Sequence, residues 1–390
     1  MSAAWTRRRI AIALIALGLG VTGWIVRPYV ASAALLLDLA DPTSRLRVWL
    51  PARPEAVRTS DLVVPTRHGP IAARMYTPVS GSSRTIVVFP GVHAGGVDEP
   101  RLAALTARLA GEGATVLAVP LPALRAYRIT PESTDAIEDT IGWLASRRDL
   151  APAGRVGVIG VSFAGGLALA AAGRPGVDSR LTAVVSLGGH GDLPRAMTYA
   201  CTGRLPDGTP RPPHDYGVVL LLRAAVGRLV PPDQVDALDR AVVTYLDASS
   251  FASLDPSRST TLFAEARRAE SILPEPARTL LHWVNERDVT PLGERLLPFV
   301  EALGGHPALS PERSPATHVP VFVLHGQLDN VIPSSEAPAL VEYLARAGNT
   351  RVRQLLTPIV SHADMRQDFS LVDAWRLTRF WTGAWRALAK

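Results

Sequence analysis

The stretch VGVIGVSFAGG (156–166) holds Ser162 between two small residues, Gly160 and Ala164, each two positions away. A serine in a G-x-S-x-small pattern is a nucleophile when the chain turns sharply from a buried strand into a helix, because the turn exposes the hydroxyl above the sheet. The apolar run before Gly160 predicts that strand, and FAGGLALAAAG predicts the helix. The backbone amide of Phe163 then points toward the same place and is a candidate donor to an oxyanion.

Glycines between a strand and a helix also occur in dinucleotide-binding proteins, where the pattern is G-x-G-x-x-G. No G-x-G occurs in 156–166, and the next apolar run, LTAVVSLGG, ends without the acidic residue that such a site needs. The sequence therefore excludes a nucleotide cofactor at this turn and favours a nucleophilic serine.

A nucleophilic serine requires a base and a carboxylate that orients the base, and in this strand–turn–helix architecture they follow in the order serine, acid, histidine. His362, in PIVSHADM, follows RVRQLL, the last expected strand, and is the predicted base. Asp329, in VPVFVLHGQLDNVIP, lies just beyond the carboxyl end of a strand and is the predicted acid. Asp192, in GGHGDLP after the preceding strand, is the alternative acid.

The second oxyanion donor is expected in the loop PGVHAGG, which follows the first buried strand. We predict the amide of Val92 for this role, with His93 as the alternative donor or as part of the pocket wall. His190 is a second candidate for the pocket.

No metal and no cofactor are predicted. His214 in PHDY stands without the carboxylate pattern of a metal site, although it and its neighbours are candidates to line the cleft. The single cysteine, Cys201, excludes an internal disulfide and a cysteine-based zinc site.

The elements that position these residues alternate between strands and helices, which predicts a mostly parallel, doubly wound α/β sheet. Buried strands are expected at RTIVVFPG, TVLAVPL, RVGVIG, LTAVVSLGG and VPVFVLHG, after a hairpin around His68. No strand pattern occurs between about 192 and 316, where the spacing is helical. We therefore expect a core at 61–191 and 317–390, with a helical cap inserted at 192–316.

The N-terminus carries Arg7–Arg9 and then an uncharged apolar run, Ile10–Val26. This pattern predicts an anchor or signal segment over 1–40, followed by a linker at 41–60. The expected location is membrane-anchored with the catalytic domain outside the cytoplasm, or secreted after cleavage near Ala31–Ala33. The segment YVASAALLLDLA (29–40) is amphipathic, and it either lies on the membrane or packs on the domain.

The formal net charge is +6, but the arginines are scattered and form no basic stripe with interleaved aromatic residues. A nucleic-acid partner is therefore excluded.

Taken together, PGVHAGG, GVSFAGG, LHGQLDNVIP and SHADM resemble the α/β-hydrolase superfamily, and within it the dienelactone-hydrolase and serine-esterase branches. The resemblance covers about 60–190 and 317–388, and departs from dienelactone hydrolases in having serine where they have cysteine. It implies a serine hydrolase that cleaves carboxylic esters, apolar or lipid-like, through an acyl-enzyme. Acyl transfer, peptide hydrolysis and a non-catalytic binding role on the same fold are the alternatives.

Overall fold

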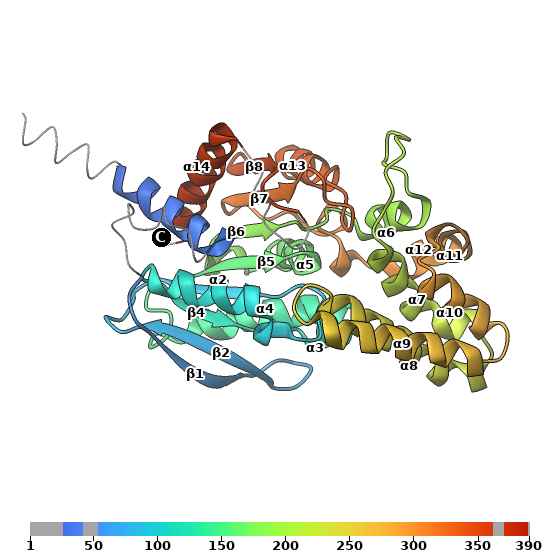
Figure 1. Cartoon of the computed structure of the whole chain (residues 1–390). Coiled ribbons are helices and arrows are strands. Elements are labelled where there is room, and N and C mark those ends of the chain that lie inside the picture. The colour runs from blue at the N-terminus through green and yellow to red at the C-terminus, as the bar shows by residue number, and fades with distance from the viewer. Residues whose placement is uncertain (1–25, 42–53, 362–369, 389–390) are drawn as a thin grey trace, which may run out of the picture.

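A mostly parallel sheet of eight strands forms the centre of the molecule (Figure 1). The computed structural model describes residues 26–41, 54–361 and 370–388. The strands are β1 (Val57–Val64), β2 (Ile71–Pro78), β3 (Thr85–Phe89), β4 (Thr115–Ala118), β5 (Val156–Val161), β6 (Leu181–Leu187), β7 (Val321–Gly326) and β8 (Val352–Thr357). Their order across the sheet is β1-β2-β4-β3-β5-β6-β7-β8.

The first two strands form the expected antiparallel hairpin, and β2 also runs antiparallel to β4. The strands from β4 through β8 are mutually parallel. β1 begins at Val57, inside the segment 41–60 that we expected to be a linker. Charged and small polar residues early in β1 hide the strand pattern, because most of this edge strand is exposed.

Helices cover both faces of the sheet. Those of the core are α2 (Pro100–Gly111), α3 (Pro122–Arg125), α4 (Pro131–Ser146), α5 (Phe163–Ala172), α13 (Glu336–Arg346) and α14 (Leu371–Leu388). Alternate residues of a strand face opposite sides: Ile86 and Val88 join the cluster under α2 and α14, whereas Val87 and Phe89 join the one under α4 and α5. Both faces are therefore buried, which explains the continuous apolar runs of the sequence.

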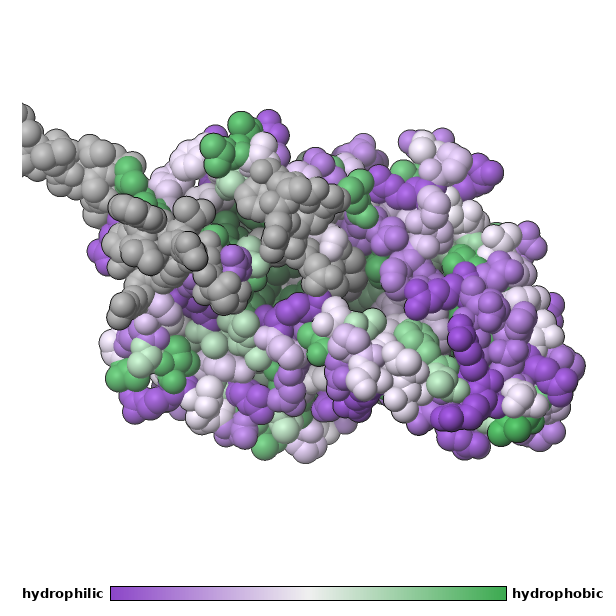
Figure 2. All heavy atoms as spheres, in the orientation of Figure 1, coloured by the Kyte–Doolittle hydropathy of each residue, from purple (hydrophilic) through white to green (hydrophobic). Residues whose placement is uncertain are grey.

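Between β6 and β7 the chain forms a helical insertion. Its helices are α6 (Leu193–Thr202), α7 (Asp215–Leu229), α8 (Pro232–Phe251), α9 (Pro256–Ile272), α10 (Ala277–Asn285), α11 (Val289–Leu296) and α12 (Val300–Gly304). They lie beyond the carboxyl ends of the parallel strands, to the right in Figure 1. The surface over α9 and α10 is largely hydrophilic in Figure 2, whereas Leu371, Val372 and Trp375 form a hydrophobic patch at the start of α14.

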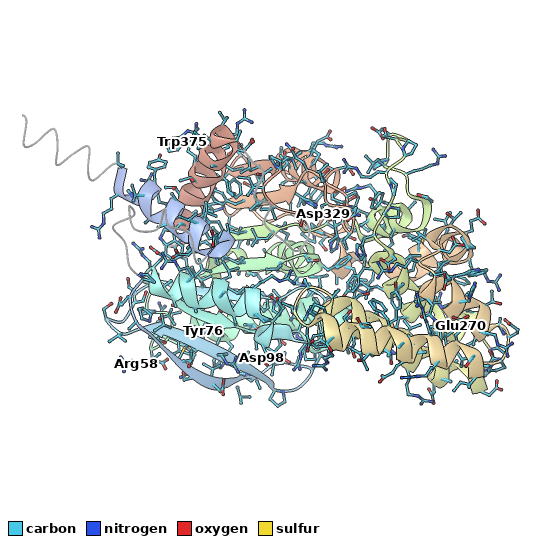
Figure 3. All side chains as sticks on the ribbon, viewed as in Figure 1. Arg58, Tyr76, Asp98, Glu270, Asp329 and Trp375 are labelled. Atoms are coloured by element: carbon cyan, nitrogen blue, oxygen red, sulfur yellow. The ribbon has the colours of Figure 1, made fainter. Side chains whose placement is uncertain are left out.

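Residues 26–40 form a helix that packs on the core next to α2 and α14. Ser32 Oγ lies 2.9 Å from Thr382 Oγ1, and Leu35 is buried in the cluster shared by α2 and α14. Tyr29 stacks on Trp375, which is labelled in Figure 3, with 5.4 Å between ring centroids. Of the two roles expected for this amphipathic segment, it takes the packing one.

The predicted membrane anchor is a point of correction. Most of the apolar run Ile10–Val26 lies outside the described residues, and no helix within 26–41, 54–361 or 370–388 is long and apolar enough to cross a bilayer. The proposed cleavage site at Ala31–Ala33 falls inside the packed helix 26–40. The predicted membrane-anchored location is therefore contradicted by the part of the chain that the structure describes.

Candidate active site

Ser162 occupies the sharp turn between β5 and α5. Its backbone has φ 55° and ψ −133°, a conformation that non-glycine residues rarely adopt. Its amide donates a 2.7 Å hydrogen bond to the carbonyl of Leu187 at the end of β6, which fixes the turn on the neighbouring strand. A strained backbone of this kind persists only when the surrounding structure holds it, and such residues cluster at functional sites.

The small residues around Ser162 are required by close backbone contacts. A β-carbon at Gly160 would lie 2.4 Å from the carbonyl oxygen of Ala164, and one at Gly165 would lie 2.5 Å from Ser186 Oγ. Ala164 is itself fully buried, so its single methyl group is accommodated in the packed turn. The alanine in the last small position of the motif is thus compatible with the elbow.

The elbow lies at the point where the chain connections leave the sheet in opposite directions. β3 and β5 are adjacent, but β3 leads to β4 on one side and β5 leads to β6 on the other. In open α/β sheets such a point leaves a crevice beyond the carboxyl ends of the strands, where ligands bind. Ser162 and the loop 90–96 after β3 border this crevice.

Three backbone amides near Ser162 are candidate oxyanion donors. Phe163 is the first residue of α5, so its N–H has no acceptor within the helix. The amides of Val92 and His93 donate to no acceptor in the part of the chain that the structure describes. The loop that carries them touches the elbow, since a β-carbon at Gly91 would lie 2.8 Å from Ser162 Cβ.

Asp329 is buried just after β7, on the side of the sheet that faces the helical insertion (Figure 3). Its Oδ1 accepts hydrogen bonds from the amides of Val331 and Ile332, at 2.9 and 3.1 Å. Its Oδ2 lies 3.4 Å from Nε2 of His325, which in turn lies 2.9 Å from the Ile332 carbonyl. This carboxylate is held in one orientation at the carboxyl edge of the sheet.

His362 lies outside the described residues. Ser361, which directly precedes it, lines the same cavity as Ser162. The loop after β8 also approaches β7, because a β-carbon at Gly326 would lie 2.3 Å from the Val360 carbonyl oxygen.

Asp192, the alternative acid, forms contacts that stabilise the start of the insertion. It is the N-cap of α6, where it accepts a 2.8 Å hydrogen bond from the Arg195 amide, and its Oδ2 forms an ion pair with Arg313. Next to it, the fully buried Glu336 accepts the Asp192 amide and pairs with the Arg195 side chain. These contacts fasten the start of the insertion to the core.

A cavity of about 450 Å³ opens above Ser162. It is bordered by the loop 90–93, the start of α2, Ser162 itself, and residues of the insertion. Its lining consists of Pro90, Gly91, Val92, His93, Gly96, Glu99, Arg101, Leu102, Leu105, Val161, Ser162, Leu187, His214, Tyr216, Ser249, Ser250, Ser253, Asn330, Val331 and Ser361. This volume is within the range of sites for small organic molecules.

The two histidines suggested for the pocket differ in position. His93 lines the cavity, and burial lowers its pKa, so the ring is neutral near pH 7. His190 is absent from the lining; it is fully buried, with Nε2 2.7 Å from the Leu309 carbonyl. His214, considered only as a cleft residue in the sequence, does line the cavity.

Glu99 and Arg101 form an ion pair in the cavity wall. Glu99 accepts the Leu102 amide at 2.8 Å as the N-cap of α2, and Arg101 Nε lies 2.7 Å from its other oxygen. Burial alone would raise the pKa of Glu99, but these hydrogen bonds outweigh burial and lower it. Glu99 is therefore an ionised helix cap at neutral pH.

Comparisons with known proteins give structural neighbours but no relatives by sequence. No family model and no curated protein matches the chain. An esterase of Pyrococcus furiosus is 15% identical, covering 83% of this chain and 90% of its own, with a TM-score of 0.46. An esterase of Pyrobaculum calidifontis is 17% identical, with 93% and 92% covered and a TM-score of 0.46. The rice cell wall degrading esterase LipA of Xanthomonas oryzae is 14% identical, with 84% and 89% covered and a TM-score of 0.49.

The assignment of the fold depends on the chain's own strand order, on the parallel strands from β4 to β8, and on the strained serine between β5 and α5. The chain has the α/β-hydrolase fold. No group of three or more metal-ligating side chains occurs among the residues that the structure describes.

The sequence predicted a helical cap with residues of PHDY lining the cleft, but not the contacts of this insertion with the loop after β3. Tyr216 of α7 and Ser250 of α8 contact Val92 and His93, which precede them by more than a hundred residues. No local pattern signals such contacts; the only hint was the polar stretch PHDY, which contains Tyr216.

Proposed function

We propose that this α/β-hydrolase is a serine hydrolase that cleaves carboxylic esters through an acyl-enzyme. The observation that carries the proposal is the strained backbone of Ser162 at the base of a cavity, next to the amides of Phe163 and of the loop 91–93. A hydroxyl beside several donor amides at a helix start is the arrangement that stabilises a tetrahedral oxyanion.

In the proposed reaction, Ser162 Oγ attacks the ester carbonyl carbon while His362 takes the hydroxyl proton. The negative charge that develops on the carbonyl oxygen is stabilised by the amides of Phe163 and of Val92 or His93. The C–O bond to the alcohol then breaks, and the alcohol leaves with the proton from His362. A water molecule then attacks the acyl-enzyme while His362 takes a proton from it. The bond to Ser162 Oγ breaks, the acid is released, and His362 returns the proton to Ser162.

Asp329 is the carboxylate that we propose orients His362. Its burial and its two amide partners support this role, because a fixed carboxylate holds the imidazole in one tautomer and stabilises the imidazolium cation. Asp192 is the weaker candidate, since Arg313 and the start of α6 already use both of its oxygens.

The substrate that we propose is a small ester with an apolar acyl group. Leu102, Leu105 and Leu187 provide an apolar part of the lining, whereas serine and histidine side chains provide a polar part. An apolar acyl chain would fit the apolar part of the lining, and a polar alcohol group would fit the polar part.

A fluorophosphonate probe and p-nitrophenyl esters of graded chain length test the proposal on the full chain. We expect labelling of the wild type, loss of labelling and hydrolysis in Ser162→Ala and His362→Ala, and no change in Ser146→Ala, which alters an exposed serine on α4. An unlabelled wild type would contradict the enzyme assignment and favour a binding role. Ester products formed with an added alcohol would indicate acyl transfer instead of hydrolysis.

A further inference from the structure

Tyr216, near the start of α7 in the insertion, contacts the loop that carries the candidate oxyanion donors. Its hydroxyl donates a 2.8 Å hydrogen bond to the carbonyl oxygen of Val92. Burial raises the pKa of Tyr216, so the hydroxyl keeps its proton and stays a donor over the neutral pH range. The ring packs edge-on against Tyr127, with 6.5 Å between centroids.

A second contact holds the next residue of the loop. His93 Nε2 lies 3.3 Å from the carbonyl oxygen of Ser250 in α8, and its Nδ1 accepts the Gly95 amide at 3.0 Å. Only a neutral ring with its proton on Nε2 satisfies both partners. Since burial lowers the pKa of His93, this is the form that the site favours.

A third contact fixes the end of α8 against the core. Tyr127 donates to Asp247 Oδ1 at 2.7 Å, and its hydroxyl lies 3.0 Å from Ser250 Oγ. Tyr216 therefore connects the insertion with the loop after β3, and Tyr127 connects α8 of the insertion with the core.

We propose that Tyr216 is a positioning residue that sets the orientation of the oxyanion donors, so that the insertion forms part of the catalytic machinery. The inference rests on the proposed function. In a trans peptide the C=O group of one residue is antiparallel to the N–H of the next, so fixing the Val92 carbonyl also fixes the His93 amide. The nitrogen of Val92 is bonded to the same α-carbon as its carbonyl group, so the Val92 amide is restrained as well. Tyr216 therefore orients both candidate donors, the amide of Val92 and the amide of His93.

The test compares the full-length wild type with Tyr216→Phe, which removes only the hydroxyl. We expect kcat for p-nitrophenyl butyrate to fall about 10- to 100-fold with KM changed less than about threefold, since misplaced oxyanion donors weaken transition-state binding. The O-thiono analogue of the ester places sulfur where the oxyanion forms, and sulfur uses the amides poorly. The preference for the oxygen ester should therefore shrink in the variant.

Tyr343→Phe is the matched control, because Tyr343 on α13 also donates to a backbone carbonyl, that of Ser314, away from the cavity. It should retain wild-type kcat and the wild-type preference for the oxygen ester. Hydrogen exchange gives a readout independent of activity: the Gly95 and Gly96 amides, which bond to His93, should exchange faster in Tyr216→Phe and not in Tyr343→Phe.

An unchanged kcat, an unchanged oxygen-to-sulfur preference or unchanged exchange at Gly95 and Gly96 in Tyr216→Phe would overturn the inference. Failure of the proposed function looks different, because the wild type would then show no hydrolysis that depends on Ser162. The exchange measurement still tests the positioning of the loop in that case.

Discussion

Gly91 lies directly against Ser162: a β-carbon at position 91 would be 2.8 Å from Ser162 Cβ and 3.1 Å from the Val161 carbonyl oxygen. The register of the sheet explains this contact. β3 and β5 are parallel neighbours with Phe89 opposite Gly160, so the residues that follow each strand emerge side by side. The nucleophile and the loop with the candidate donors are thus brought together by two adjacent strand ends.

Gly91→Ala should therefore separate the loop from the elbow. The added methyl group has no room, and a displacement of about 1 Å at such a site costs about 100-fold in rate. We expect kcat/KM for a short p-nitrophenyl ester to fall by that order, with the fold retained by circular dichroism.

Gly227→Ala on α7 is the control, because nothing lies within 4 Å of the added β-carbon. Alanine in a helix is favoured over glycine by about 1 kcal/mol, so this variant should be as stable as the wild type or more stable. Wild-type activity in Gly91→Ala would show that the contact is unimportant for the reaction.

Substitutions of the two candidate acids should separate catalysis from structure. Asp329→Asn should lower kcat by about 10⁴-fold, the loss seen when the carboxylate of a serine triad becomes an amide. Asp192→Asn should lower the free energy of unfolding by up to about 1 kcal/mol through loss of the ion pair with Arg313, since asparagine caps a helix as well as aspartate does, with kcat nearly unchanged. Steady-state kinetics and urea unfolding of both variants check this, and the reverse pattern would make Asp192 the catalytic acid.

The sheet and the elbow were predictable from the sequence because their signals are local. Strands buried on both faces need continuous apolar runs, and the turn at Ser162 needs small residues at Gly160 and Gly165. Asp329 and Asp192 look alike in sequence, since each follows a strand end. They differ in their partners: Asp192 pairs with Arg313, which is 121 positions away, and accepts the Arg195 amide. The sequence alone does not reveal these contacts.

The contacts of the insertion were not predictable, because they join residues far apart along the chain. Tyr216 and Val92 are 124 positions apart, and His93 and Ser250 are 157. The N-terminal segment illustrates a different limit. An amphipathic helix such as 26–40 has the same pattern whether its apolar face meets lipid or another part of the protein, and here that face meets α2 and α14.

His190 should make the protein less stable in mild acid. Burial lowers its pKa in the folded state, whereas in the unfolded chain the ring titrates near pH 6.5. Below about pH 6.5 the unfolded state binds a proton that the native state refuses, so the free energy of unfolding falls as the pH decreases. Urea unfolding between pH 5 and 8 should show this slope, and His190→Gln should reduce it.

The reduction should be partial, because burial also lowers the pKa of His93 and gives a slope of the same sign. A His190→Gln protein with the full wild-type slope would mean that His190 does not contribute to acid sensitivity.

Leu35 tests whether the helix 26–40 is part of the folded core. The side chain is only 2% exposed and belongs to the cluster that includes Leu109 of α2 and Trp381 of α14. Leu35→Ala should lower the free energy of unfolding by about 2 to 5 kcal/mol, the cost of a cavity at a buried leucine. Val26→Ala, at a residue of the same helix that is 44% exposed, should change it by less than about 0.5 kcal/mol. Equal urea midpoints for the two variants would show that this helix is not packed on the core in solution.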